Sequence, residues 1–335
     1  MEYKYSNALD IFGLKSNVRK DYENRVRFMH NQARELRIDA RPVEVCPICG
    51  HAESSEAHLI HGWSYQQCAN CTHVYNALEI HPERLTAYYM ETAGEFSYAS
   101  TYIDDEDAQR IRQESAATPK VDYISEFKDG HRSWIDIATG NADILHIARE
   151  RGFEVKGIEL NEGLIEYAKK VYDIDVYGGT LLDYAKDFPQ EKWDIVTFIG
   201  ILDILPDAIA YLKTARSMQE PGGLMAVNVP HYNSLTRTIQ RAYSNRVVRH
   251  AFPNLFHLFT QESITKALEI AGYRPVGMWF YGMDIYELIN NLHLESYPFR
   301  ESALEAKLME LVNELQAVID QQKASDEFLL VAQAV

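Results

Sequence analysis

Positive charge is scarce in this sequence. Lys and Arg together number 33, against 49 Asp and Glu, so the formal net charge is −16 at pH 7. An acidic surface repels phosphate backbones, and we therefore do not expect DNA or RNA as a partner. A small neutral or cationic molecule is compatible with this charge.

Long apolar runs are also missing. No stretch is long enough to cross a bilayer, and the first residues do not read as a basic-then-apolar signal sequence. We therefore expect no membrane partner and a cytoplasmic location. With 335 residues, 46% of them hydrophobic, the chain can form a full-sized core and a small satellite domain.

Cysteine is rare, and its four copies are clustered. Cys46 and Cys49 form one CxxC pair, and Cys68 and Cys71 form a second after eighteen intervening residues. In a zinc ribbon, each such pair makes a tight turn that directs two thiolates to one ion. Four thiolates fill a tetrahedral zinc shell and leave no position for water, which predicts a structural site. Two disulfides are the alternative, but they need an oxidising compartment that nothing in the sequence supports.

Four histidines lie close to these cysteines: His51, His58, His61 and His73. Because four thiolates already complete the shell, we expect these histidines to be exposed loop residues rather than ligands.

From residue 133 onward, short apolar runs alternate with helical patterns, which predicts an α/β fold with a parallel sheet. The expected strands are Trp134–Ala138, Glu154–Glu159, Asp175–Tyr177, Trp193–Ile199, Leu224–Val229, Arg274–Trp279 and Phe328–Ala332. The expected helices between them are Ile144–Arg151, Glu162–Tyr172, Ala208–Met218 and Glu262–Ala271.

The first of these strands runs into a glycine turn at Gly140 and then into a helix. The second strand ends in an acidic residue, Glu159. A glycine turn lets the backbone approach a ligand, and an acid at the next strand end can accept hydrogen bonds from ribose hydroxyls. The alternative is that Gly140 is only a turn and Glu159 only a solvated cap.

The run from Ile135 to Asn161 reads IDIATGNADILHIARERGFEVKGIELN. It resembles motif I and its sequel in class I S-adenosylmethionine-dependent methyltransferases, particularly a group with an N-terminal zinc ribbon that reads LDIGCGTGxFLxxAxxxGxxVxGIELS. The middle motif glycine is Gly140, while Ala138 and Ala142 replace the first and third.

Further blocks resemble the same group in the same order, from residue 45 to residue 281. They are Cys46–Gly50 (CPxCG), Cys68–Tyr75 (CxxCGxVY), Gly179–Asp183 (GTLEE), Trp193–Thr197 (FDVVT), Pro221–Leu224 (PGG) and Phe259–Gly272 (FTPESLxxLLExAGF). The resemblance implies a Rossmann-like, seven-stranded methyltransferase sheet that binds S-adenosylmethionine. The cofactor-binding residues that it implies are Asp136, Ala138, Gly140, Glu159, Leu160, Thr180, Leu181, Leu182 and Ile199.

The pattern along the sequence also divides the chain. We expect a helical extension over residues 1–42, a zinc ribbon over 43–80, and a helical lid or linker over 81–130. Residues 131–335 would form the methyltransferase domain, with a C-terminal helix at about 301–322.

Methyl transfer needs alignment of the two reactants and, for weak nucleophiles, a base. The segment after strand four, where the family reads EHLPDP, places Ile204 at its frequent histidine and keeps an acid as Asp203. After strand five, His231 replaces the family's asparagine and is our first candidate for a general base, because imidazole titrates near neutral pH. His257 is the second candidate. A hydrogen-bonded loop histidine is the alternative for His231, and a pocket wall or ordinary core is the alternative for His257.

The resemblance therefore implies methyl transfer to an oxygen, nitrogen or carbon of a small molecule, such as a sugar or a secondary metabolite. A non-catalytic assembly protein with a degenerate methyltransferase fold is the second interpretation, supported by Ala138, Ala142 and Ile204. A nicotinamide-dependent oxidoreductase ranks last, because it predicts three glycines in the first turn.

The C-terminal helix carries an a/d stripe of Leu304, Leu308, Leu311, Leu315 and Val318. Such a stripe can be the seam of a homodimer. Only about two heptads are present, so we favour docking against the chain's own sheet.

Overall fold

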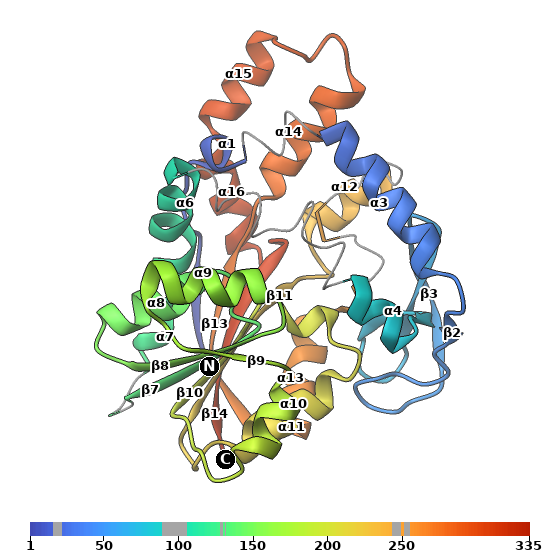
Figure 1. The fold of residues 1–335 in the computed structure, drawn as a ribbon. Coiled ribbons are helices and arrows are strands. Elements are labelled where there is room, and N and C mark those ends of the chain that lie inside the picture. The colour runs from blue at the N-terminus through green and yellow to red at the C-terminus, as the bar shows by residue number, and fades with distance from the viewer. Residues whose placement is uncertain (16–21, 89–105, 128–129, 131, 243–248, 251–254) are drawn as a thin grey trace.

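The computed structural model describes the whole chain except residues 16–21, 89–105, 128–129, 131, 243–248 and 251–254. Much of the expected lid, residues 89–105, therefore lies outside the described residues. A large sheet with helices on both faces forms the centre, and a smaller sheet that includes β3 lies to one side (Figure 1).

The large sheet contains eight strands in the described part of the chain. In spatial order they are β1 (Glu2–Tyr5), β13 (Tyr273–Tyr281), β14 (Glu327–Ala334), β11 (Leu224–Pro230), β10 (Ile195–Ile199), β7 (Ser133–Ile137), β8 (Glu154–Glu159) and β9 (Val176–Gly178). Neighbours are parallel, except that β14 runs antiparallel to both β11 and β13. The predicted α/β fold is confirmed, with β1 as an additional strand.

The helices are named here in chain order, with the short 3-10 and π turns as η. They are α1 (Ile11–Leu14), α3 (Tyr22–Leu36), α4 (Pro82–Ala87), α6 (Glu106–Arg112), η2 (Gln113–Ala117), α7 (Thr118–Ser125), α8 (Asp143–Glu150), α9 (Glu162–Tyr172), α10 (Leu181–Asp187), η3 (Leu202–Ile204), α11 (Ala208–Ser217), α12 (Leu235–Ala242), α13 (Gln261–Ile270), α14 (Asp284–Glu295), α15 (Ala303–Glu310) and α16 (Val312–Gln321). Within the described residues, no helix has both the length and the apolar character that a membrane span requires.

Both faces of the large sheet are apolar, as parallel strands covered on both sides require. Trp134 and Ile195 face one buried cluster, which also takes residues from α7, α8 and α9. Ile135 and Val196, one position further along the same strands, face the other cluster with α10, α11 and α13. This alternation explains why each strand reads as a continuous apolar run.

Strand β1 corrects the prediction of a helical extension over residues 1–42. It pairs in parallel with β13, and Tyr3 and Tyr5 both stack against Phe280, at ring-centroid distances of 6.4 and 6.3 Å. A four-residue strand is too short to show a period, and its partner lies far along the chain, so only tertiary contact reveals it.

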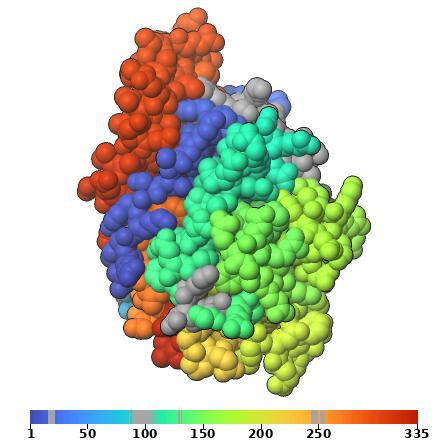
Figure 2. All heavy atoms as spheres, turned by 90° about the vertical axis from the view of Figure 1, so that its left-hand side faces the viewer, coloured from blue at the N-terminus to red at the C-terminus, as the bar shows by residue number. Residues whose placement is uncertain are grey.

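The single C-terminal helix expected at 301–322 is in fact two helices, α15 and α16, which meet at Leu311. Leu308 and Leu315 pack into a cluster with residues of α14, whereas Leu304 and Val318 are more than half exposed. Figure 2 shows this orange-red pair projecting from the body of the molecule. The stripe is therefore partly docked within the chain, and the dimer seam stays a prediction.

The smaller sheet lies next to the cysteine pairs in the sequence, and Cys68 is the last residue of one of its strands. Strands β3 (Ser54–Ile60), β4 (Trp63–Cys68) and β5 (Val74–Asn76) form a meander, and a distant strand, β12 (His257–Leu258), pairs antiparallel with β5. A separate pair, β2 (Arg41–Pro42) and β6 (Leu78–Glu79), joins the two ends of this region. The cysteine-bearing sheet is thus completed by a strand from the other half of the chain.

Candidate functional site

The two CxxC pairs form turns with the same hydrogen bonds. In the first turn, the amide of Cys46 donates to the His51 carbonyl at 2.8 Å, and the amide of Gly50 donates to the Cys46 carbonyl at 2.8 Å. The second turn repeats both bonds, at 2.9 and 3.2 Å, with Cys68, His73 and Thr72 in the corresponding places. The matching turns present four thiols from two separate loops to one point.

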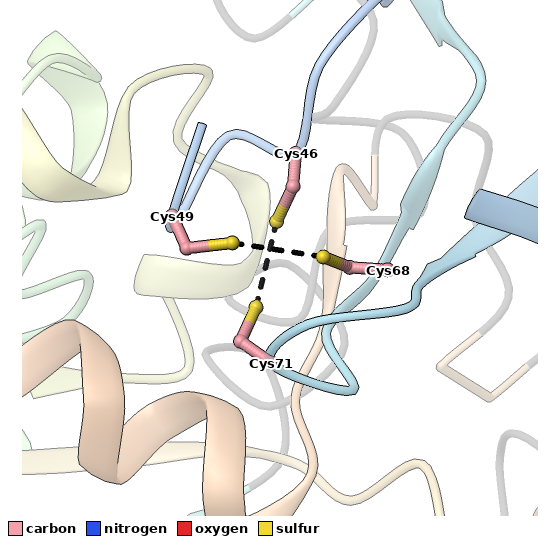
Figure 3. Close-up of side chains that lie close together, drawn as sticks. All are labelled: Cys46, Cys49, Cys68 and Cys71. Carbon is pink, nitrogen blue, oxygen red and sulfur yellow. Dashed lines mark hydrogen bonds between the residues drawn. The ribbon is translucent and has the colours of Figure 1, made fainter. Parts of the chain in front are cut away.

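The four sulfur atoms converge, as Figure 3 shows. The Sγ atoms of Cys46 and Cys71 are 3.6 Å apart, as are those of Cys49 and Cys68, and all four lie within 4.8 Å of one another. Zn–S bonds of about 2.3 Å in a tetrahedron place sulfur atoms about 3.8 Å apart. The cluster therefore fits a four-thiolate metal site in the way the sequence predicted.

Two of the neighbouring histidines, which we expected to be exposed, are buried. His73 is fully buried and His58 nearly so, whereas the side chain of His51 is 40% exposed beside Glu53. His58 Nδ1 accepts a hydrogen bond from Arg241, and His73 Nε2 lies 3.0 Å from His257 Nδ1. Burial arises because the cysteine-bearing sheet packs onto the other half of the chain, a contact that local sequence does not reveal.

A crevice for a ligand is expected where the strand order reverses direction. The chain leaves β7 toward β8 and β9, and it then returns to place β10 on the other side of β7. In such sheets, ligands bind outside the carboxyl ends of the strands at this switch point. Gly140 after β7 and Gly200 after β10 both have positive φ, and neither has an atom within 4 Å of the place where a Cβ would stand. Open space therefore adjoins the backbone at both strand ends.

Glu159, at the end of β8, connects this strand end to the turn after β7. Its Oε2 accepts a hydrogen bond from the amide of Gly140 at 2.9 Å. Its Oε1 accepts from the amides of Leu160 and Asn161, at 2.8 and 3.0 Å. Each carboxylate oxygen has about two acceptor directions, so Oε2 keeps capacity for a further donor. The structure thus joins the two residues, Gly140 and Glu159, that the sequence selected separately.

The two alanines that replace motif glycines adopt the glycine conformation. Ala138 has φ of 53° and Ala142 has φ of 63°, both in the left-handed region. An L-residue pays about 1–2 kcal/mol for this conformation. Ala142 also buries its methyl group in the cluster with α8, whereas Ala138 is only partly buried. The turn therefore holds two left-handed residues that are not glycine.

Asp136 lies behind the turn rather than on its surface. It is 2% exposed, and Thr197 on the adjacent strand β10 donates a 2.5 Å hydrogen bond to its Oδ1. Burial raises the pKa of its carboxyl to about 7. Asp136 is thus a buried residue of β7 that is held by β10, just before the turn at Gly140.

The remaining candidate cofactor residues differ in how deeply they are buried. Thr180 caps α10 through Asp183, and the amide of Gly179 donates to the Glu159 carbonyl at 3.0 Å, which brings this segment beside β8. Leu181 is 1% exposed and belongs to the core, whereas Leu160 is 42% exposed. Leu182 follows on α10 and Ile199 ends β10, and both are partly buried. Their contacts with a cofactor stay predictions.

His231, our first candidate base, lies at the end of β11 and is 4% exposed. Its ring packs against Phe328 and Phe280, with centroids 5.2 and 5.9 Å away, and its Nδ1 lies 3.1 Å from the Ser325 carbonyl. Burial lowers the pKa of this imidazole to about 4. The His231 side chain is thus packed in the apolar core beside Phe280 and Phe328, and its catalytic role stays a prediction.

His257, the second candidate, is 1% exposed and is engaged at both nitrogens. Nδ1 faces His73 Nε2 at 3.0 Å, and Nε2 lies 2.9 Å from the Leu205 carbonyl. Burial lowers the pKa of His257 to about 4. This histidine fills a structural position between the cysteine-bearing sheet and the loop after β10.

Asp203, in η3 after β10, is the candidate with an unmet hydrogen bond. It is 5% exposed, and its Oδ1 has no hydrogen-bond partner in the described part of the chain. Burial, together with the nearby charge of Glu327, raises the pKa of the Asp203 carboxyl to about 7. A group that titrates near neutral pH and lacks a partner is suited to accept a proton from a ligand.

Comparison with known proteins assigns the fold. Residues 108–277, half of the chain, match the family model described as "Methyltransferase domain". The chain belongs to this methyltransferase domain family. The matched residues run from α6 through the crevice and into β13.

Curated relatives of the methyltransferase domain are distant. A ubiquinone biosynthesis O-methyltransferase of Actinobacillus pleuropneumoniae is 22% identical over 134 residues, which are 36% of this chain and 54% of that protein. A 27-O-demethylrifamycin SV methyltransferase of Amycolatopsis mediterranei is 26% identical over 132 residues, which are 38% of this chain and 48% of that protein. The chain spans about half the length of these relatives.

Solved methyltransferase structures are similar to the chain at low identity. A SAM-dependent methyltransferase from Archaeoglobus fulgidus has a TM-score of 0.48 and 19% identity, covering 69% of this chain and 99% of that one. The plantazolicin methyltransferase, solved in complex with a triazolic desmethylPZN analog and SAH, has a TM-score of 0.46 and 16% identity, covering 75% of this chain and 97% of that one.

Sequence reasoning missed a polar cluster at the carboxyl edge of the methyltransferase domain. Arg249 Nε lies 2.7 Å from Asp326 Oδ2, and its Nη2 lies 2.5 Å from Glu327 Oε1. Asn228, on β11, donates to Glu327 Oε2 at 3.3 Å. These partners are separated by 77 to 99 positions in the sequence, so no local motif could reveal the cluster.

Proposed function

We propose that this chain transfers a methyl group from S-adenosylmethionine to a small-molecule acceptor. The observation that carries the proposal is the Gly140–Glu159 hydrogen bond at the switch point of a methyltransferase domain, beside open space at both strand ends. When bound, the cofactor supplies a methyl group on a sulfonium, which is already a good leaving group.

The residues at the crevice fit an adenosyl group. Glu159 offers a carboxylate oxygen with spare acceptor capacity to a ribose hydroxyl. Gly140 and Gly200 let the backbone approach the ligand closely, because the place of a Cβ is empty. The segment from Gly179 to Leu182 lies beside Glu159 and is our proposed adenine-side wall.

Oxygen is the acceptor atom that the relatives favour, because two of them are named as methyltransferases of oxygen atoms. An acceptor hydroxyl must lose its proton as it is methylated. We assign that proton to Asp203, whose Oδ1 is unpartnered in the described residues and whose pKa lies near 7. His231 and His257 rank below it, because both are held in the core by hydrogen bonds and ring contacts.

The four cysteines are proposed to hold one structural zinc ion. Their spacing, convergence and sulfur–sulfur distances support zinc, which accepts four thiolates without redox chemistry. Thiolate ligands persist in a reducing compartment, so we propose a cytoplasmic location for the protein.

A non-catalytic assembly role is the second candidate function. It is favoured by the left-handed Ala138 and Ala142, and by the three amides that already occupy the Glu159 carboxylate. The two functions differ in whether the crevice takes an adenosyl ligand.

Titration calorimetry of the full zinc-loaded chain with S-adenosylhomocysteine tests the proposal. We expect binding of one molecule per chain at micromolar to submillimolar concentrations. Absence of heat at millimolar ligand, from protein that is folded and metal-loaded, would favour the assembly role instead.

A further inference from the structure

A series of contacts leads from the cysteine cluster to the loop after β10 that carries Asp203. The second cysteine turn ends at His73, whose carbonyl accepts from Cys68 at 2.9 Å. The His73 ring is fully buried, and its Nε2 lies 3.0 Å from His257 Nδ1. His257 Nε2 then lies 2.9 Å from the carbonyl of Leu205, two residues after Asp203.

The direction of these bonds follows from the groups at the ends. A carbonyl oxygen only accepts, so His257 Nε2 carries the proton that it donates to Leu205. The neutral ring then accepts at Nδ1, and His73 Nε2 donates to it. His73 Nδ1 lies 3.3 Å from Ser263 Oγ on α13, whose single proton is shared between this nitrogen and the Thr260 carbonyl, also at 3.3 Å. The contacts from His73 Nε2 to His257 and from His257 to Leu205 therefore have a defined direction.

A second connection runs through the backbone beside these rings. The amide of Phe256 donates to the carbonyl of Asp203 at 2.9 Å. The carbonyl of Phe256 accepts from the amide of Asn76, the last residue of β5, at 2.9 Å. Segment 255–258 thus serves as the edge of the cysteine-bearing sheet on one side and as the support of η3 on the other.

From these contacts we infer that the metal-bound module positions the loop carrying Asp203, with His257 as the positioning residue. The inference rests on the proposed role of Asp203. Metal binding orders the turn at Cys68–Cys71, this turn fixes His73, and His73 and β5 together fix β12. Residues 203 and 205 are then held by Phe256 and His257. Among the described residues, no hydrogen bond joins Gly140 or Glu159 to this chain of contacts, so the cofactor side should not depend on the metal.

His51 in the first cysteine turn provides a matched control for His73 in the second. His51 occupies the same place in the first cysteine turn as His73 in the second, yet its side chain is 40% exposed and faces Glu53. His51→Gln should therefore leave the loop after β10 unchanged. His257→Gln and His257→Asn form a second matched pair. Glutamine can place its amide nitrogen near the Nε2 position and still donate to Leu205, whereas asparagine is too short.

The experiment is hydrogen–deuterium exchange on the full chain, followed in peptides that contain the amides of Ile204 and Phe256. The Ile204 amide is bonded to the Ile201 carbonyl, and the Thr139 amide, bonded to the Ile158 carbonyl, reports on the cofactor crevice. We expect both reporter amides to exchange about tenfold faster after metal is removed by a chelator, with Thr139 changed less than about twofold. His257→Asn should reproduce this increase with zinc still bound, and His257→Gln should restore slow exchange.

Unchanged exchange at Ile204 and Phe256, in protein shown to have lost its metal, would overturn the inference. If metal removal unfolds the whole chain, the zinc-loaded His257 variants decide, and equal rates in the Asn and Gln variants would likewise overturn it. Binding of S-adenosylhomocysteine is measured in parallel. Its absence from the unaltered chain would remove the proposed enzyme function, while the exchange data would still judge the coupling.

Discussion

Thr72 Oγ1 and Thr260 Oγ1 lie 2.7 Å apart, so the second cysteine turn is hydrogen-bonded to the residue that caps α13. Thr72 has φ of 59°, a conformation that a β-branched residue rarely adopts, and Gly50 holds the corresponding place in the first turn. Thr72, the strained residue, is thus also the one that makes the tertiary contact. The pattern CxxCGxVY, which this segment resembles, has glycine at the position of Thr72, and a glycine could not make this hydrogen bond.

Replacing Thr72 with valine should lower the free energy of unfolding by about 1–2 kcal/mol, because the hydrogen bond between the Thr72 and Thr260 hydroxyls is lost. Thr72→Ser keeps the hydroxyl and should stay within about 0.5 kcal/mol of the unaltered protein. Urea denaturation of the zinc-loaded chains measures both. Equal stability of the valine and serine variants would show that the Thr72–Thr260 bond contributes nothing.

Metal analysis should find about one zinc per chain, because the four thiolates form one closed shell. Cys49→Ser should reduce the bound zinc severalfold and lower the thermal midpoint. His51→Gln is the control, since His51 is not among the converging ligands, and it should keep the full metal content. A Cys49→Ser protein with unaltered zinc would contradict the four-thiolate site.

Replacing Glu159 with alanine should weaken binding of S-adenosylhomocysteine by about 1–3 kcal/mol, because the ribose loses a charged acceptor. Glu154→Ala at the opposite end of the same strand should leave the affinity unchanged. Calorimetry gives both values. Unaltered affinity in the Glu159 variant would remove this residue from the cofactor site.

Ala138→Gly should raise the free energy of unfolding by about 0.5–1 kcal/mol, because glycine adopts the left-handed conformation without strain. Ala142→Gly should raise the free energy of unfolding by less, because the buried methyl group of Ala142 is lost at the same time. Ala226→Gly, in the buried strand β11, should be destabilising. Thermal denaturation ranks the three variants, and a loss of stability in Ala138→Gly would contradict the strain argument.

The stability of the protein should fall as pH rises from about 4 to 7, in part because of Asp203. Its folded pKa of about 7 lies above the ordinary value of 3.8, so the folded state holds a proton that the unfolded state has released. The contribution is therefore complete below pH 4 and is lost as pH rises through 7. Asp203→Asn should reduce this slope by up to about 1.4 kcal/mol per pH unit.

Denaturation series at several pH values measure that slope. Asp107→Asn is the control, because the Asp107 side chain is 87% exposed. Its slope should match that of the unaltered chain. An unchanged slope in Asp203→Asn would show that Asp203 is ionised in the folded protein.

The local sequence pattern was sufficient to predict most strands of the large sheet. The strand at Glu154–Glu159 has the predicted bounds, and β7, β10 and β11 differ by only one or two residues at an end. Continuous apolar runs bounded by turn residues carry this information, because a strand covered on both faces must be apolar along its length. The break at Leu311 and the strand β1 escaped the same reasoning, since neither has a local signal.

For the site, the sequence by itself determined which residues occur in motifs: the four cysteines, Gly140 and Glu159. Their spacing is local, and zinc and nucleotide sites impose that spacing on nearby residues. Only the tertiary structure decided which histidines are buried, that Asp203 lacks a partner in the described chain, and that His257 joins the cysteine module to its loop. These relationships join segments up to 184 positions apart, and burial and hydrogen bonding across such distances depend on how the sheets pack rather than on neighbouring residues.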